Sequence, residues 1–471
     1  MHRYWSLFRN VRWSAIFLGL AALAQAPSLA AQQVTVTSPN ATTVWKYNDP
    51  GCGFTVGSTF YADYSDVPAR PFLVGDLSSP TVLWFAANSN GSFASVGTSP
   101  PPDVLAGFQR GTANGPGCVS WLQPTSYPNS TPASYDTGLW MVAPFTPDGI
   151  NVQALVHNEF HGEWTGNISS CWQQGSQQIY MPCNYWNIVS ASSSDAGQGF
   201  QLRQQQGAAG TNVPAIVLGQ AYQAPPKSSP SNVPPHGVTA QSNILQVGQY
   251  YYVLVQQLPY VGLGVPASLK GVCIYQAPVP PTPGAPLTWM GWNGGGYNVP
   301  VAGSYPIGGQ MPFCWPVLGE PFRFSWSLNT VLNQLIIIGQ DMTAGLKANG
   351  VNLDNCPYAP GVSATTTDSA FVYRTATLSS TGQLQLAQAE TCLLQTLSIN
   401  TWAGNKTLTG QAYPSLLDPL SPTLAPGDRN FQHSGQLPFL YFTQLNPTGN
   451  PGYDRDVVRM PLLVTPGNTA R

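Results

Sequence analysis

The chain has 471 residues, of which only 8% are charged, and it contains 47 glycines and 45 prolines. Its 17 basic and 19 acidic residues form no basic run, which excludes an electrostatic interface for nucleic acid. The glycine and proline content disfavours long helices, because proline removes a backbone donor and glycine loses entropy in a helix interior.

The first 30 residues have the pattern of a secretory signal peptide. Three arginines precede the apolar run 15–23, and Ser28-Leu29-Ala30 is a small-residue cleavage site. No later stretch is apolar over the roughly 18 residues that a membrane helix needs. We therefore expect a signal peptide over 1–30 and a secreted or periplasmic protein over 31–471, without membrane insertion. Those later residues carry 14 basic and 19 acidic side chains, a net charge of −5.

All eight cysteines lie beyond residue 30, and an even number in an exported protein indicates disulfides. Cys171 and Cys183 enclose a short polar loop and are the first expected pair. Pairing the remaining neighbours predicts three more bridges: Cys52–Cys118, Cys273–Cys314 and Cys356–Cys392. Structural zinc is the alternative, but no two cysteines stand at the close spacing of zinc ligands.

Short aromatic and β-branched runs between Gly, Pro and Asn turns predict an all-β protein. The candidate strands fall into five clusters, at 54–86, 139–202, 215–275, 322–376 and 393–464. Repetition of this kind favours a five-bladed β-propeller that fills residues 31–471 as a single domain. A pair of β-sandwich domains is the structural alternative.

The densest group of ionisable residues is His157-Asn158-Glu159-Phe160-His161-Gly162-Glu163, with two of the four glutamates and two of the five histidines. It follows the β-branched run 150–156, which predicts a strand. Because side chains alternate along a strand, the two histidines and the two glutamates are expected on one face. That face can present an acid, a proton shuttle or a set of metal ligands.

Two further motifs place polar or aromatic residues beside turns. Asp66 and Arg70 flank a Pro-Ala turn, where the cation can keep the carboxylate ionised or form a buried structural pair. Trp292 precedes the glycine run 294–296, and an aromatic ring beside glycines can form a platform for a sugar. Core packing is the commoner role for such a ring.

The last two motifs lie near the end of the chain. Tyr413 and Asp418 enclose an apolar segment, and a turn or helix-capping role is the alternative for Asp418. Asp454, Arg455 and Asp456 predict a surface salt-bridge cluster.

In their order, these motifs resemble those of secreted bacterial proteins related to five-bladed β-propeller glycoside hydrolases of the arabinanase, β-xylosidase and β-fructosidase kind. The resemblance runs from about residue 50 to the C-terminus. It implies an active site at the propeller axis, built from acids on the innermost strands of different blades. Carried over to this chain, it makes Asp66 the first-blade base or nucleophile, Glu159 the general acid and Asp418 the third carboxylate.

The remaining candidate residues would bind an oligo- or polysaccharide substrate: Arg70, His157, Asn158, His161, Trp292 and Tyr413. No cofactor is expected. Because the third cluster offers no acid in a comparable motif, a non-catalytic carbohydrate-binding or surface-interaction propeller is the first alternative. The second is a metal site at His157, Glu159 and His161, although a hydrogen-bonded network without metal fits the same residues.

Overall fold

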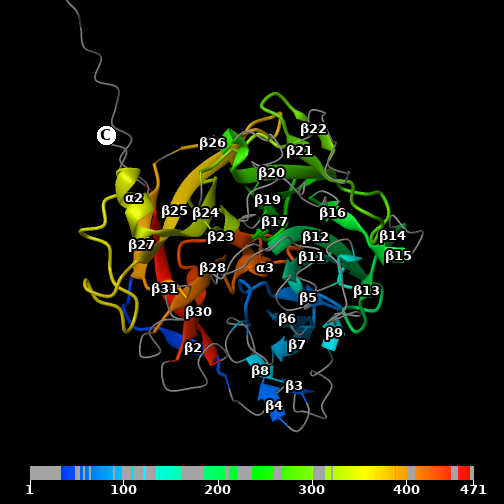
Figure 1. The fold of residues 1–471 in the computed structure, drawn as a ribbon, viewed down its shortest axis with the longest axis horizontal. Coiled ribbons are helices and arrows are strands. Elements are labelled where there is room, and N and C mark those ends of the chain that lie inside the picture. Colours follow the sequence, from blue (N-terminus) through cyan, green and yellow to red (C-terminus); the bar gives the residue numbers. More distant parts are fainter. Residues whose placement is uncertain are drawn as a thin grey trace, which may run out of the picture.

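A computed structural model gives the fold of the protein and is almost entirely β (Figure 1). It describes residues 33–47, 53–56, 59–62, 65–88, 91–97, 105, 108–110, 120–122, 134–136, 138–161, 184–206, 212–219, 236–258, 267–300, 313–319, 322–387, 389–399, 409–446 and 454–466. Within these ranges no helix has the length and apolar character needed to cross a membrane.

Five groups of mainly antiparallel strands, which we call the first to the fifth sheet, are arranged around a common centre (Figure 1). The second and third are joined edge to edge, because Tyr185 and Trp186 pair in parallel with His236 and Gly237. The first sheet contains β5 (Phe72–Val74), β6 (Thr81–Asn88), β7 (Gly91–Gly97), β8 (Phe108–Arg110) and β9 (Ser120–Leu122). The second contains β10 (Leu139–Phe145), β11 (Val152–His161), β12 (Asn184–Ser193), β13 (Gln201–Leu202) and β16 (Ile216–Leu218). The third contains β17 (His236–Thr239), β18 (Leu245–Val247), β19 (Tyr250–Leu258), β20 (Gly271–Pro278), β21 (Met290–Trp292) and β22 (Tyr297–Pro300).

The fourth sheet contains β23 (Phe322–Asn329), β24 (Gln334–Met342), β25 (Ser369–Leu378), β26 (Leu384–Leu386) and β27 (Thr391–Thr396), with β29 (His433–Ser434) added beside β23. The fifth contains β28 (Gln411–Leu417), β30 (Phe439–Leu445), β31 (Arg455–Thr465), β1 (Gln33–Val36) and β2 (Thr42–Trp45). Two hairpins lie outside the sheets: β3 (Gly53–Val56) with β4 (Thr59–Ala62), and β14 (Gln204–Gln206) with β15 (Asn212–Pro214). The short helices are η4 (Ala267–Leu269), α2 (Thr343–Ala348) and α3 (Ser421–Leu424).

Apolar cores join the sheets in a closed cycle. Separate clusters of buried side chains lie between the first and second sheets, the second and third, the third and fourth, and the fourth and fifth. A further cluster returns from the fifth sheet to the first, where Tyr441 and Val457 pack with Leu73 and Trp84. The predicted all-β fold is confirmed, and the five sheets are the blades of a propeller.

The two ends of the described chain meet in the fifth sheet. β1 and β2 both pair antiparallel with β31, so that Val34 lies opposite Val464. Val34 is 3% exposed and packs in the core between the fourth and fifth sheets. The last sheet is thus completed by the first strands of the chain. Such pairing between the two chain ends holds the ring of sheets closed.

Two strands were assigned to the wrong cluster by sequence. β16 pairs with β12 of the second sheet, so it does not open the third; β17 has that position. β27 pairs with β25 of the fourth sheet, and β28 is the innermost strand of the fifth. Both errors have one cause, because edge strands carry the same alternating pattern as inner strands.

Two of the expected disulfides are present, Cys273–Cys314 and Cys356–Cys392. They tie β20 to the segment before Leu318, and the segment after α2 to β27. The other four cysteines, and the signal-peptide region 1–30, lie outside the described residues.

The segment 428–435 crosses one end of the propeller axis and defines its two faces. The Arg429 carbonyl accepts from Leu73 N at the end of the first sheet's inner strand. The Asn430 side chain accepts from Thr146 N through Oδ1 and donates from Nδ2 to the Thr146 carbonyl, directly after β10. The Gln432 carbonyl accepts from Leu328 N near the end of β23. The inner strands therefore finish at one face, which we call the C-face. They begin at the other, the N-face.

Asp428 holds this crossing segment in place. Its Oδ2 accepts hydrogen bonds from Ser421 Oγ at 2.7 Å, from Gln432 N at 2.7 Å and from His433 N at 3.1 Å. His433 Nδ1 lies 2.9 Å from the same oxygen, and Asn430 N donates to Oδ1 at 2.9 Å. Burial raises the pKa of Asp428, but the hydrogen bonds from His433 and Ser421 outweigh it, so the pKa lies below its ordinary value.

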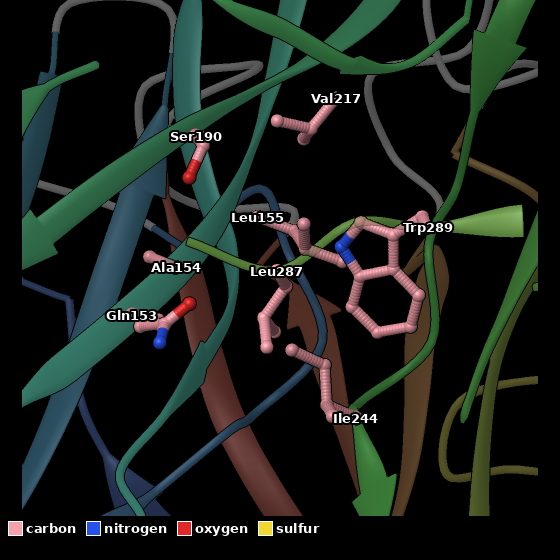
Figure 2. Close-up of a pocket in the computed structure, with 8 residues that line it drawn as sticks. All are labelled: Gln153, Ala154, Leu155, Ser190, Val217, Ile244, Leu287 and Trp289. Atoms are coloured by element: carbon pink, nitrogen blue, oxygen red, sulfur yellow. The ribbon is translucent and has the colours of Figure 1, made fainter. Parts of the chain in front are cut away.

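A small cavity between the second and third sheets is a packing gap (Figure 2). Its volume is about 10 Å³, which leaves room for about one water molecule. Figure 2 shows the Trp289 indole beside Leu155 and Leu287, with Ile244 below them. A sugar ring does not fit there.

We expect Val34→Asp to lower the free energy of unfolding by about 3 kcal/mol or more, because it buries an unpartnered carboxylate in an apolar core. The matched control is Thr35→Asp, one residue along the same strand, where the side chain is exposed. It should change stability by less than about 0.5 kcal/mol. Urea unfolding measures both, and an equal loss in the two variants would contradict ring closure through β1.

We expect Asp428→Asn to be less stable than wild type by roughly 1–3 kcal/mol at pH 7. Because the folded-state pKa of Asp428 is lowered, its ionised form contributes stability above the unfolded pKa, and this is lost as pH falls through the folded pKa. The gap between wild type and variant should therefore shrink below about pH 4. Urea unfolding at pH 7, 5 and 3.5 measures the gap, and a constant gap would contradict this role.

Candidate functional site

Asp66 joins the first and fifth sheets at the N-face. The Tyr413 hydroxyl and the Arg455 guanidinium both donate to its Oδ1. Tyr413 belongs to β28 and Arg455 is the first residue of β31, so both approach from the fifth sheet. The Asp66 side chain is 22% exposed. The salt-bridge partner is thus Arg455, and the expectation that Arg70 pairs with Asp66 is wrong.

Arg70 is a buried cation at the propeller centre. Its Nη1 donates to Ser415 Oγ at 2.8 Å and its Nη2 to the Phe324 carbonyl at 2.8 Å, which links the first, fourth and fifth sheets. Burial lowers the pKa of Arg70 to about 9. No carboxylate of the described residues forms an ion pair with it, and its Nε makes no hydrogen bond. A guanidinium stays protonated near neutral pH, so this charge is held without neutralisation.

Glu159 and His157 form the second part of the site, on β11. The indole Nε1 of Trp186 donates to Glu159 Oε1 at 2.6 Å, and His157 Nε2 lies 3.4 Å from Oε2. His157 Nδ1 lies 3.5 Å from Thr239 Oγ1 in the third sheet. The two residues share one face of the strand, as alternation predicts, and the face turns toward the third sheet.

A short chain of contacts connects Glu159 with Asp66. Val67, directly after Asp66, packs with Trp140 of β10. The Trp140 ring lies 5.3 Å from the His157 ring between centroids, and His157 contacts Glu159. The two acids are therefore connected through side-chain contacts at the N-face.

Strained backbone accompanies these residues. Tyr135, which precedes β10, has φ of 52°, and Tyr413 within β28 has φ of 60°, values that non-glycine residues rarely adopt. The other non-glycine residues of the described chain with positive φ lie elsewhere in the fold: Ala196, Ala240, Asn333 and Phe431. Such strain is typical of functional sites, where surrounding structure maintains it.

Asp136 is a further acid at the N-face, and no motif in the sequence predicted it. It precedes β10 just as Asp66 precedes β5, so ring closure carries both to the N-face. Asp136 is buried, with 8% of its surface exposed. The available signal was its position, an acid directly before the innermost strand of a blade.

Three predicted residues lie elsewhere or cannot be placed. Asn158 points to the opposite face of β11 from Glu159, is fully buried, and accepts from Asn187 Nδ2 at 3.1 Å. Trp292 is 4% exposed and packs against Tyr297 in the core between the third and fourth sheets. His161 ends β11, but its side chain and Glu163 lie outside the described residues.

Asp418 stands at the C-face, away from Asp66. It follows the last residue of β28, whereas Tyr413, which bonds Asp66, lies near the first. Its Oδ1 accepts from Leu420 N at 2.9 Å and its Oδ2 from Gly435 N at 2.7 Å. This is the turn role foreseen as its alternative, and the structure does not bring it together with the other two acids.

Within the described residues, no cluster of three His, Cys, Asp or Glu side chains is arranged to hold a metal ion. His157 and Glu159 contact each other, and the third ligand of the predicted metal set, His161, has a side chain outside those residues.

No protein-family model and no curated protein matches the sequence. Among solved structures, the chain is similar to the catalytic domain of a GH62 α-L-arabinofuranosidase from Coprinopsis cinerea, at 11% identity and a TM-score of 0.36, over 89% of this chain and 97% of that one. It is also similar to an endo-1,4-β-xylanase from Bacteroides thetaiotaomicron, at 9% and 0.35, over 76% and 100%. For a GH32 β-fructofuranosidase from Bombyx mori the values are 9% and 0.39, over 90% and 63%. TM-scores this low do not establish a shared fold or function. The fold and the candidate site are therefore described from the residues of this chain alone.

We expect Asp418→Ala to lower the free energy of unfolding by roughly 1–3 kcal/mol, because two backbone N–H groups lose their acceptor. The control is Asp354→Ala, at an exposed position, which should stay within about 0.5 kcal/mol of wild type. Thermal and urea unfolding measure both. An Asp418→Ala protein as stable as wild type would contradict a structural role.

Proposed function

We propose that the protein is a secreted glycoside hydrolase that acts on an oligo- or polysaccharide at the N-face of the propeller. The observation that carries this proposal is the placement of Asp66 and Glu159 on the same face with different partners. Asp66 faces the Arg455 guanidinium, whereas Glu159 faces an indole N–H and an imidazole.

Glycoside hydrolysis needs one carboxyl group ionised and another that carries a proton. An ionised Asp66 is matched by the charge of Arg455, which suits a base or nucleophile. Glu159 is the proton donor in this proposal, and His157 Nε2 lies 3.4 Å from its Oε2. Asp136, before the neighbouring inner strand, is a third carboxyl at the same face and replaces Asp418.

Substrate contacts are proposed for His157, Tyr413 and Arg70. His157 and Tyr413 each touch one of the two acids, so a sugar between the acids meets both side chains. Arg70 supplies an unneutralised positive charge at the centre. His161 remains a proposed contact, since it lies two residues after Glu159 on β11. Asn158 is omitted because it points to the opposite face of β11 and bonds Asn187, and Trp292 because it packs in the core between the third and fourth sheets.

A non-catalytic carbohydrate-binding propeller is the second candidate. It is favoured by the start of the third sheet's inner strand, where His236 stands in place of an acid and is 2% exposed. Export is proposed for both candidates. Two disulfides in the described residues support it, because disulfides persist in oxidising compartments.

The test is hydrolysis of a panel of soluble polysaccharides and aryl glycosides by wild type, Asp66→Asn and Glu159→Gln. Both variants should lose roughly 10²- to 10⁴-fold in kcat while they keep binding. Asp354→Asn, an exposed acid in the fourth sheet region, is the matched control and should be fully active.

Each outcome separates the candidates. Activity of Glu159→Gln equal to wild type would overturn the assignment of the acid. Binding of a polysaccharide without cleavage by any protein would establish the non-catalytic propeller. Loss of binding after EDTA treatment would support the metal site at His157, Glu159 and His161.

A further inference from the structure

Trp315 is unlike the other tryptophans whose side-chain exposure the structure describes. It is 59% exposed, whereas those others are each at most 8% exposed: Trp45, Trp84, Trp140, Trp186, Trp289, Trp292 and Trp326. An exposed indole leaves a large apolar area in water, which needs a reason.

The backbone of Trp315 is fixed on both sides. Cys314 is fully buried and bonded to Cys273 of β20, and Trp315 N donates to the Trp292 carbonyl at 2.6 Å. Two residues later, Val317 N donates to the Val272 carbonyl at 2.8 Å. The indole is therefore presented from a rigid base, so little conformational entropy is lost when it binds a partner.

A turn of three glycines lies beside the indole, and these glycines place no side chains of their own there. The turn is Asn293-Gly294-Gly295-Gly296, in which Asn293 Oδ1 accepts from Gly295 N and Gly296 N at 2.9 Å each. Gly294 has φ of +97°, and a Cβ built there would lie 4.0 Å from Trp315 Cγ. A Cβ at Gly296 would meet nothing within 4 Å. An exposed aromatic face thus borders an open, polar shelf.

Trp315 lies toward the same face of the propeller as Glu159. One row of paired residues runs from Glu159 to Trp186 and then to Gly237 of β17. From Gly237 the row continues to Leu258 of β19, beside which Gln257 pairs with Gly271 at the start of β20. The disulfide at Cys273 holds Trp315 near this end of β20. Four strand spacings separate β11 from β20, or roughly 20 Å along the sheet.

We infer that Trp315 and the turn 293–296 form a remote subsite for a polysaccharide chain, distinct from the predicted platform at Trp292. The inference rests on the proposed action on carbohydrate. An indole face stacks on the C–H face of a sugar ring, and the exposed amide and backbone groups of the turn can bond its hydroxyls. At this distance the subsite contacts a long chain but not the sugars next to the bond that is cleaved.

The test is affinity electrophoresis of wild type and Trp315→Ala in gels that contain arabinan, arabinoxylan, β-mannan, levan or polygalacturonan. Trp315→Ala should weaken binding of the retained polysaccharide roughly tenfold. The control is Tyr250→Ala, an aromatic that is 42% exposed on the same sheet but at the start of β19, toward the C-face. It should bind as wild type does, and unchanged circular dichroism confirms that both variants fold.

Kinetics separate this inference from the proposed function. Trp315→Ala should lose roughly tenfold in kcat/KM on the polymer and nothing on an aryl glycoside. If wild type cleaves the polymer and Trp315→Ala binds and cleaves it equally well, the inference fails and the hydrolase proposal stands. If wild type binds through Trp315 but cleaves nothing, the inference stands and the hydrolase proposal fails. Retention of no polysaccharide by wild type overturns the inference.

Discussion

Each blade of this protein has two apolar faces, and both are buried only because the sheets close into a ring. Five separate cores fill the spaces between consecutive sheets, and the last of them brings the fifth sheet back against the first. No sheet could shield its own side chains from water, so the stability of each depends on its two neighbours. β1 and β2 pair with β31 and complete the fifth sheet, so the last sheet depends on the first strands of the chain.

The same closure positions the candidate site. Inner strands that run in one direction around an axis bring their first residues to one face, whatever their separation in sequence. Asp66 and Asp136 precede two of these strands, and Tyr413 lies near the start of a third. Arg455 reaches Asp66 across 389 residues of sequence because β31 begins at this face. The C-face, by contrast, is covered by the segment 428–435, which Asp428 holds in place.

Local patterns in the sequence predicted local structure well. Alternation along β11 correctly placed His157 and Glu159 on one face, and neighbour pairing found the two disulfides of the described residues. The errors concern which residues lie close together in space and which residues form ion pairs. Tyr413 and Asp418 are close in sequence, but an extended strand separates them by roughly 16 Å and carries them to opposite faces. Arg70 is near Asp66 in the chain, yet the salt bridge is made by Arg455, which only the closed ring can reveal. Similarly, Trp292 packs in the core between the third and fourth sheets, whereas Trp315, whose N–H donates to the Trp292 carbonyl, is exposed.

We propose that a sugar binds at the N-face between Asp66 and Glu159. The most direct measurement is a crystal structure of Glu159→Gln soaked with a polysaccharide fragment that the protein retains. We expect sugar density in contact with both Asp66 and the glutamine side chain of the Glu159→Gln variant, with His157 and Tyr413 alongside. Density only at the C-face, near the segment 428–435, would contradict it.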